Sequence, residues 1–149
     1  MWAAALWVTS CGASLPQEAV VRRVIDGDTI ELADGRLLRY IGVNSPEVRR
    51  RVGERWVVDP EPMGQEAAAF NRHLVEGKRV HLEYDVQTHD RFGRLLAYVY
   101  AGKVMVNEKL LEEGFAQPMT IPPNVRYAQR FRALAEAARR EGRGLWRAR

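Results

Sequence analysis

Apolar stretches separated by turn signals dominate the chain between residues 19 and 43. An apolar stretch over 19–25 reaches the turn dipeptide Asp26-Gly27, and a second one follows over 30–32. Another dipeptide, Asp34-Gly35, then leads into a third stretch over 36–43. Asp-Gly between apolar stretches is the strongest short-range signal of a β-hairpin. This part of the chain therefore predicts a meander of three strands.

Residues 44–62 break this pattern. They contain three prolines, Gly53 and the charge run Arg49-Arg50-Arg51. The composition predicts a long irregular loop, and loops of this length are usually functional or mobile. We interpret the three arginines as a solvated charge run, with binding of phosphates by charge alone as the alternative.

The rest of the chain alternates between helical and strand periodicity. Strands are predicted over 80–84 and 95–100, with a short partner strand around 104–106. The predicted helices span residues 64–76, 107–113 and 125–141, with Asn107 capping the second and prolines making 117–124 irregular. The order is three strands, a helix, two or three strands and two helices. It predicts an α+β fold, and five short strands with helices at one end match an OB-type five-stranded β-barrel with three helices.

Composition sets limits on this picture without naming a function. The 149 residues suit one domain, and 46% hydrophobic residues are enough for a core. The net charge of +4 is a mild tilt toward anionic partners. A single cysteine, Cys11, excludes an intramolecular disulfide and a multi-cysteine zinc site.

The N-terminus differs from the rest of the chain, because no charged side chain precedes Glu18. Val8-Thr9-Ser10-Cys11 resembles a bacterial lipobox, whose cysteine becomes lipidated. We therefore expect residues 1–17 to form a signal or lipoprotein segment with a tether, and 18–149 to form the folded domain. A secreted or membrane-anchored, extracytoplasmic protein follows from this expectation. The alternative is an ordinary free cysteine on a cytoplasmic protein, since no Lys or Arg precedes the apolar run.

Several short polar segments carry the side chains that phosphodiester cleavage requires. Guanidinium groups stabilise the negative charge that develops on phosphate oxygens, and Arg39 and Arg94 are the candidates. A hard cation such as Ca²⁺ binds carboxylate and amide oxygens, which Asp28 and Asn44 offer. Glu47 is the candidate for orienting or deprotonating a water molecule. Each segment alone also fits an ordinary turn, exposed loop or helix cap.

Taken together, these segments resemble the thermonuclease (staphylococcal-nuclease-like) family. The matching motifs occur in the family's order over residues 19–147, and they are Val24-Ile25-Asp26-Gly27-Asp28-Thr29, Arg39 through Pro46-Glu47, Asp90-Arg91-Phe92-Gly93-Arg94, Val106-Asn107-Glu108 and Gly144-Leu145-Trp146. The resemblance implies an OB-type barrel and Ca²⁺-dependent hydrolysis of DNA and RNA that leaves 3′-phosphate ends. It also implies metal ligation by Asp28, Asn44 and the Ser45 carbonyl, a general base at Glu47, and catalytic arginines at Arg39 and Arg94.

The chain departs from the family pattern at three places. Asn44 stands where an aspartate is usual, which keeps an oxygen ligand but removes a negative charge and predicts weaker Ca²⁺ binding or a shifted metal preference. Phe92 and the pair Thr120 and Pro122 stand where the best-known member has tyrosines. Asn44 keeps open the alternative of a non-catalytic nucleic-acid-binding module on the same barrel. We expect the protein to act as a monomer.

Overall fold

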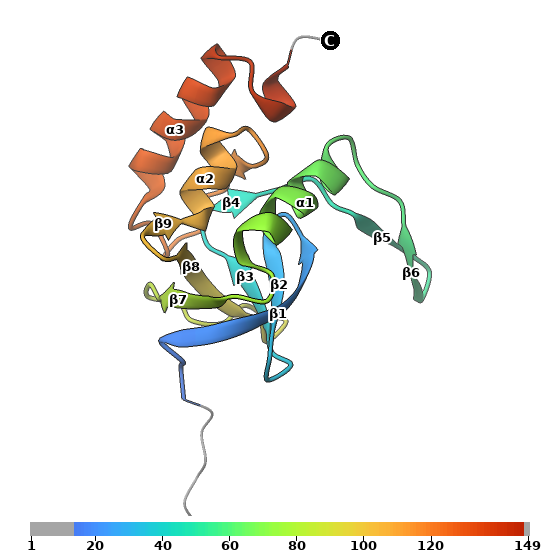
Figure 1. The fold of residues 1–149 in the computed structure, drawn as a ribbon, viewed down its shortest axis with the longest axis vertical. Coiled ribbons are helices and arrows are strands. Elements are labelled where there is room, and N and C mark those ends of the chain that lie inside the picture. Colours follow the sequence, from blue (N-terminus) through green and yellow to red (C-terminus); the bar gives the residue numbers. More distant parts are fainter. Residues whose placement is uncertain (1–13, 148–149) are drawn as a thin grey trace, which may run out of the picture.

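The computed structural model describes residues 14–147, and five of its strands form a closed barrel (Figure 1). β1 (Glu18–Asp26), β2 (Thr29–Leu32) and β3 (Leu37–Tyr40) make the predicted antiparallel meander. β7 (Arg79–Glu83) pairs with β1, and β8 (Leu95–Ala101) pairs with β7. The turns after β1 and β2 lie at the two Asp-Gly dipeptides, as the sequence predicts.

A parallel pairing between β3 and β8 closes the barrel. Leu38 lies opposite Leu95, Arg39 opposite Leu96, and Tyr40 opposite Ala97. The third predicted strand ends earlier than expected, because Gly42 has a φ of 79° that breaks the strand before the short β4 (Val43–Asn44). β4 pairs with β10 (Gln117–Pro118), and β9 (Val104–Met105) extends the sheet beside β8.

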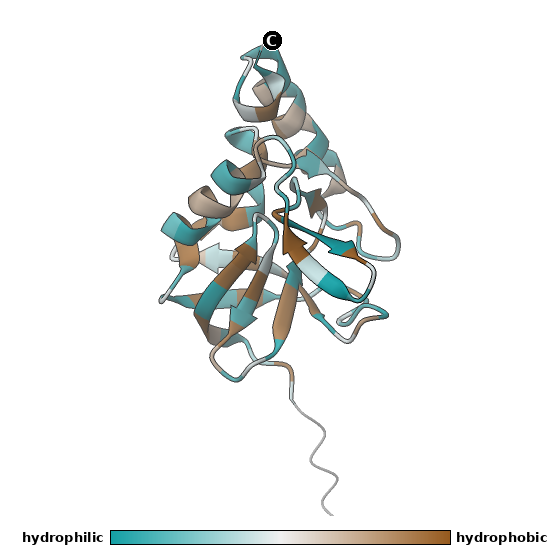
Figure 2. Cartoon of the chain, turned by 90° about the vertical axis from the view of Figure 1, so that its right-hand side faces the viewer, coloured by the Kyte–Doolittle hydropathy of each residue, from teal (hydrophilic) through white to brown (hydrophobic). Residues whose placement is uncertain are grey.

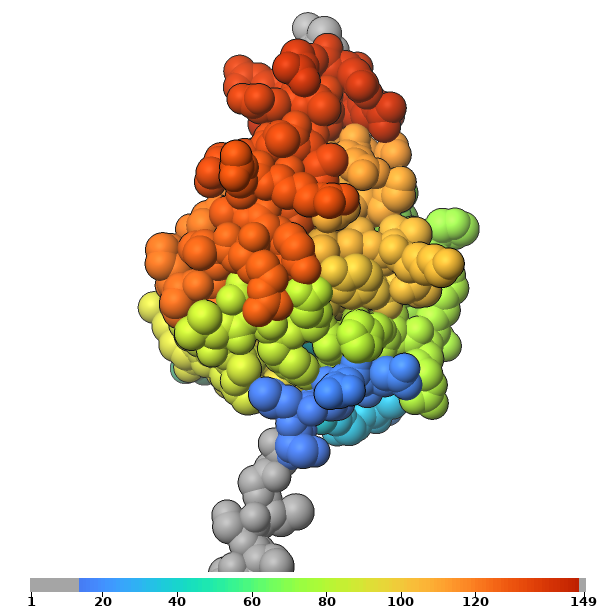
Figure 3. Space-filling view, turned by 90° about the vertical axis from the view of Figure 1, so that its left-hand side faces the viewer, coloured from blue at the N-terminus to red at the C-terminus, as the bar shows by residue number. Residues whose placement is uncertain are grey.

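Three helices cover one end of the barrel. They are α1 (Gly64–Val75), α2 (Val106–Glu112) and α3 (Ala128–Arg140), and a 3-10 helix, η1 (Gly144–Trp146), follows. α3 lies across α2 on the face shown in Figure 3, with β7 and β1 below it. The α+β, OB-type fold with three helices is therefore confirmed.

The core lies between the barrel and these helices. Its largest side chains are almost fully buried, and they include Tyr40, Tyr98, Phe131, Leu38 and Leu110. Burial of an apolar side chain of this size contributes about 1.5–3 kcal/mol. Tyr40 also anchors α1, because its hydroxyl donates a hydrogen bond to Asn71 Oδ1 at 2.7 Å. The strand that carries Arg39 is thus fixed against a helix.

Two predictions are wrong in detail. Residues 44–62 include an antiparallel hairpin, β5 (Arg49–Val52) and β6 (Arg55–Val58), where an irregular loop was expected. Its strands are rich in arginine and exposed, so they lack the alternation that marks a half-buried strand. Asn107 does not cap α2, whose N-cap residue is Met105. Buried Asn107 instead accepts a hydrogen bond from Val99 N and donates one to Ile41 O.

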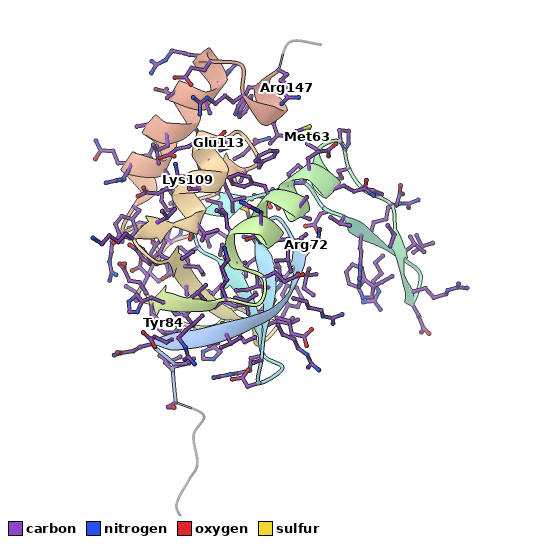
Figure 4. The ribbon with its side chains drawn as sticks, in the orientation of Figure 1. Met63, Arg72, Tyr84, Lys109, Glu113 and Arg147 are labelled. Atoms are coloured by element: carbon purple, nitrogen blue, oxygen red, sulfur yellow. The ribbon has the colours of Figure 1, made fainter. Side chains whose placement is uncertain are left out.

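The N-terminal segment reaches the barrel shortly before β1. Leu82 N donates a hydrogen bond to Gln17 O, and the Tyr84 hydroxyl donates one to Pro16 O at 2.6 Å. Figure 4 labels Tyr84 near this junction. The expected lipobox and Cys11 lie outside the described residues. Within residues 14–147, no helix is both long and apolar enough to cross a bilayer.

Candidate active site

The β3–β8 pairing that closes the barrel brings the two candidate arginines to one pocket. Arg39 lies opposite Leu96, and Arg94 precedes Leu96 by two residues. Residues two apart along an extended chain share a face, so Arg94 faces the same side as Arg39. Both side chains line a pocket whose other walls include Gln87, Met119 and Ile121. The pocket therefore presents two guanidinium groups beside apolar surface.

Asp90 fixes the loop that carries Arg94. One of its carboxylate oxygens accepts hydrogen bonds from Phe92 N and Arg94 N, and the other accepts one from Arg94 Nε at 2.7 Å. Gly93 makes the turn possible with a φ of 78°. Partial burial raises the pKa of Asp90, but hydrogen bonds from Arg94 and its charge outweigh this, so the net pKa lies below its usual value. Arg94 is thus held in place while its side chain lines the pocket.

Arg39 ties together the end of β3 and the start of β4. Its Nη1 donates to Tyr40 O at 2.8 Å and to Val43 O at 2.7 Å. Its Nη2 lies 3.2 Å from Asn44 Oδ1 and 3.2 Å from Asp28 Oδ2. One nitrogen of Arg39 therefore lies next to an oxygen of each of two candidate metal ligands.

Asp28 lies at the turn between β1 and β2 with only 2% of its surface exposed. Its Oδ2 accepts a hydrogen bond from Ser45 N at 2.7 Å, and its Oδ1 accepts one from Thr29 Oγ1 at 2.9 Å. Gly27 allows the close packing here, since a Cβ at that position would lie 2.6 Å from Ser45 Oγ. The turn that the sequence marks as a simple hairpin signal therefore positions a buried carboxylate against Ser45.

Asp26 is a functional candidate that our sequence reasoning missed. Its side chain is 8% exposed, and its Oδ1 accepts a hydrogen bond from Asp28 N. Burial raises the pKa of Asp26 to about 8, and the negative charge of Asp28 is the second cause of this rise. The sequence does offer a signal, because Asp26 lies two residues before the candidate metal ligand Asp28. The pattern Asp26-Gly27 is also that of a hairpin turn, and this explains why the residue is not among the sequence candidates.

Glu47 lies near the same acidic group. Burial and the charge of Asp28 raise the pKa of Glu47, while a hydrogen bond with Asp26 and the charge of Arg39 oppose that rise. Its backbone N–H donates to Glu61 Oε2 at 2.9 Å, which fixes the segment that carries it. The structure thus brings Glu47 into electrostatic contact with Asp28 and Arg39.

The remaining candidates face a second, shallow hollow beside the arginine pocket. Asn44 and Ser45 line it together with Glu61 and Gln117. Arg39 connects the two hollows through its contact with Asn44 Oδ1, whereas Arg94 lines only the first. The six predicted site residues therefore form one neighbourhood around Arg39 rather than one enclosed cavity.

The oxygen atoms in this neighbourhood fit a hard cation. Asp28 offers a carboxylate, Asn44 an amide oxygen and Ser45 a backbone carbonyl, which are the ligand types that Ca²⁺ takes. The buried Ser45 Oγ has no hydrogen-bond partner in the part of the chain that the structure describes, so a polar atom here is left unsatisfied. Within residues 14–147, no three His, Cys, Asp or Glu side chains gather as a metal-binding group. A bound ion would therefore depend on amide, carbonyl and water oxygens as well as carboxylate.

Comparison with known proteins gives the same family as the sequence motifs. Residues 37–148 match the family model described as "Staphylococcal nuclease homologue". The chain is 41% identical over 133 residues to a thermonuclease of Staphylococcus hyicus, and the match covers 85% of this chain and 73% of that protein. It is also 41% identical over 129 residues to a thermonuclease of Staphylococcus intermedius, covering 82% of this chain and 69% of the relative.

A third relative is more distant. It is the endonuclease YncB of Bacillus subtilis, 35% identical over 129 residues, a match that covers 83% of this chain and 59% of that protein. The family model spans well over half of the chain and includes five of the six predicted site residues. With the closed barrel and the motifs in register, this shows that the chain belongs to the staphylococcal nuclease family and is a hydrolase of the nuclease class.

Proposed function

We propose that this nuclease hydrolyses phosphodiester bonds of DNA and RNA with a bound Ca²⁺ and leaves 3′-phosphate ends. The observation that carries the proposal is the geometry around Arg39. This residue shares a pocket with Arg94 and touches both Asp28 and Asn44. A phosphate in the pocket would meet two guanidinium groups, which bind its oxygens and stabilise the charge that develops on them.

Asp28, Asn44 and the Ser45 carbonyl would hold the cation. When bound, the ion supplies positive charge to the phosphate oxygens. Buried Asp26 and Asp28, with Glu47 near them, support the presence of a cation, because among the described residues Arg39 is the one basic side chain that forms an ion pair with this group. Another divalent ion could replace Ca²⁺, since Asn44 brings no negative charge.

Glu47 would orient or deprotonate the attacking water. The carboxylate interacts with Asp26 and Arg39, and the hydrogen bond from its backbone N–H to Glu61 limits the movement of its segment. Proton transfer by a positioned carboxylate contributes about 10²–10⁴-fold to a rate. Arg39 and Arg94 would meanwhile hold the phosphate in the arginine pocket.

Cleavage of single-stranded DNA and RNA oligonucleotides, in Ca²⁺ and in chelator, tests this proposal. We expect fragments with 3′-phosphate ends in Ca²⁺ and intact substrate in chelator. Retention in a gel shift without cleavage across several divalent ions would contradict the proposal. That outcome would favour the non-catalytic binding module that Asn44 keeps open.

We also propose that the protein is extracytoplasmic and anchored through a lipidated Cys11. The support is the lipobox-like tetrapeptide Val8-Thr9-Ser10-Cys11. Metabolic labelling with a clickable fatty acid should label the wild-type protein and leave the Cys11→Ala variant unlabelled. Absence of label, or label that survives in the variant, would contradict the anchoring proposal.

A further inference from the structure

The β5–β6 hairpin projects from the molecule beyond α1 (Figure 1). Beyond their mutual pairing, its strands make at most marginal contacts with other elements. Side chains stand out from both sides of the hairpin (Figure 4). A hairpin of four residues on each strand is about 13 Å long at the usual rise per residue. The chain therefore builds an ordered, exposed arm where the sequence predicted an irregular loop.

The arm begins directly at the candidate active site. Its two ends are clamped together, because Asp59 N donates to Val48 O and Glu61 N donates to Glu47 O at 2.9 Å. Glu61 also accepts the hydrogen bond from Glu47 N. A nucleic acid strand whose scissile phosphate lies near Glu47 would therefore have its flanking nucleotides within reach of the arm.

The strand register gives the arm two different faces. Residues directly opposite each other in an antiparallel pair share a face, so Arg49 lies beside Val58 and Arg51 beside Trp56. All four of these residues are exposed, with Trp56 at 66% and Val58 at 67%. The hydropathy colours on the hairpin change along both strands (Figure 2). We call this surface of Arg49, Arg51, Trp56 and Val58 the Trp56 face.

The opposite face is more engaged with the protein. It carries Arg50, Val52, Arg55 and Val57; Arg50 forms an ion pair with Asp59, and Val57 is half-buried. Among residues 14–147, neither Arg49 nor Arg51 forms an ion pair, and Arg51 Nε donates a hydrogen bond to Gly53 O. Arg55 is also exposed on this opposite face, but only the Trp56 face combines two arginines with an exposed aromatic ring.

We propose that the Trp56 face binds the single-stranded nucleic acid that flanks the scissile bond. This inference rests on the proposed nuclease function and gives that site a second contact with its substrate. Trp56 stacks on a base, because every base has a π-face that an exposed indole can cover. Arg49 and Arg51 bind phosphates on either side of that base. The combination of positive charge and a stacking platform is the usual composition of a single-strand binding surface.

Binding of a fluorescent 20-nucleotide DNA, measured by anisotropy in chelator, tests the proposal without cleavage. Trp56→Ala should weaken binding about fivefold to tenfold through lost stacking, and Trp56→Phe should retain most of the affinity. Arg49→Ala with Arg51→Ala should make the plot of log affinity against log salt shallower by about 1.4, and the double Lys variant should not. Arg50→Ala with Arg55→Ala removes the same number of charges from the opposite face and is the matched control, which should leave the slope unchanged.

Cleavage of a dinucleotide separates this proposal from the proposed function. A dinucleotide has no flanking nucleotides, so the alanine variants should cleave it like the wild type while their KM for the 20-nucleotide DNA rises. Wild-type affinity and salt slope in these variants would overturn the proposal even if cleavage is intact.

Loss of binding to anionic lipid vesicles, with unchanged DNA binding, would assign the face to a membrane instead. Failure of the wild type to cleave any substrate would count against the nuclease function and leave the anisotropy test of the arm valid.

Discussion

Asn44 sets the charge of the candidate metal site at the scale of a single residue. It provides an amide oxygen, and that oxygen already accepts a hydrogen bond from Arg39 Nη2 at 3.2 Å. A carboxylate at this position would add a negative charge to the ligand set while keeping the oxygen. Calcium affinity follows the number of charged ligands, so this position should control how tightly the protein holds Ca²⁺.

Asn44→Asp should lower the Ca²⁺ concentration at the titration midpoint by about tenfold. Calorimetric titration of the metal-free protein measures the midpoint directly. Gln129→Glu is a matched control, because Gln129 is exposed on α3 and does not line either hollow. It adds the same charge to the protein without placing a carboxylate at the proposed site and should shift the midpoint much less. Equal midpoints for the wild type and Asn44→Asp would refute the role assigned to Asn44.

The motifs alone provide the six candidate site residues, but they do not predict the contacts that Asp26 and Asp90 make. Asp90 was assigned to a charged loop, yet it accepts three hydrogen bonds that shape the loop and hold Arg94. These contacts depend on the path of the backbone through a turn. A sequence pattern carries no direct signal for such a path, so the supporting carboxylates became visible only in the structure.

At the scale of the element, Glu83 joins the barrel to the C-terminal helix. This residue of β7 accepts hydrogen bonds from the hydroxyls of Tyr127 and Tyr100, and from Arg126 Nη1 at 2.8 Å. Burial raises the pKa of Glu83, but these hydrogen bonds outweigh it and bring the pKa below its ordinary value of 4.5. The ionised side chain therefore links β7, β8 and the segment that enters α3.

Glu83→Gln should lower the free energy of unfolding at pH 7 by about 1–2 kcal/mol. The folded-state pKa of Glu83 is lower than the unfolded one, so its stabilising contribution is present above pH 4.5 and is lost as the pH falls through the folded-state pKa. The difference between the variant and the wild type should therefore shrink below pH 4.5. Urea unfolding across this pH range measures it.

Glu136→Gln is the control for this experiment, because Glu136 is exposed on α3. It should leave both the stability at pH 7 and its pH dependence close to wild type. A difference between Glu83→Gln and wild type that persists undiminished below pH 4 would contradict the assigned role of the carboxylate.

Elements with an apolar face were predictable, and exposed ones were not. The Asp-Gly turns and the helical stripes predicted β1 to β3 and α1 to α3 because burial imposes a period on the sequence. The β5–β6 hairpin has no buried face, so its pattern of four arginines and scattered apolar residues carries no such period. Asn107 was assigned to a cap because it begins a helix, whereas its amide bridges buried backbone groups of β8 and Ile41.

At the scale of the whole molecule, closure of the barrel creates the candidate site. β3 and β8 are far apart in sequence, and their parallel pairing puts Arg39 and Arg94 on one pocket. The fold class follows from the order of the elements, but this register does not follow from periodicity. Arginines near the C-terminus also join elements of the fold, since Arg126, Arg130 and Arg143 form ion pairs with glutamates.

The central claim is that Glu47 acts on water in a site whose arginines hold the phosphate. Single-turnover cleavage of an oligonucleotide by Glu47→Gln, with saturating Ca²⁺, tests it most directly, and oligonucleotide affinity is measured in parallel. Glu54→Gln, in the turn of the exposed hairpin, is the matched control. We predict that Glu47→Gln slows cleavage by about 10²–10⁴-fold with affinity within a few-fold of wild type, and that Glu54→Gln cleaves normally. Cleavage by Glu47→Gln at the wild-type rate would contradict the account.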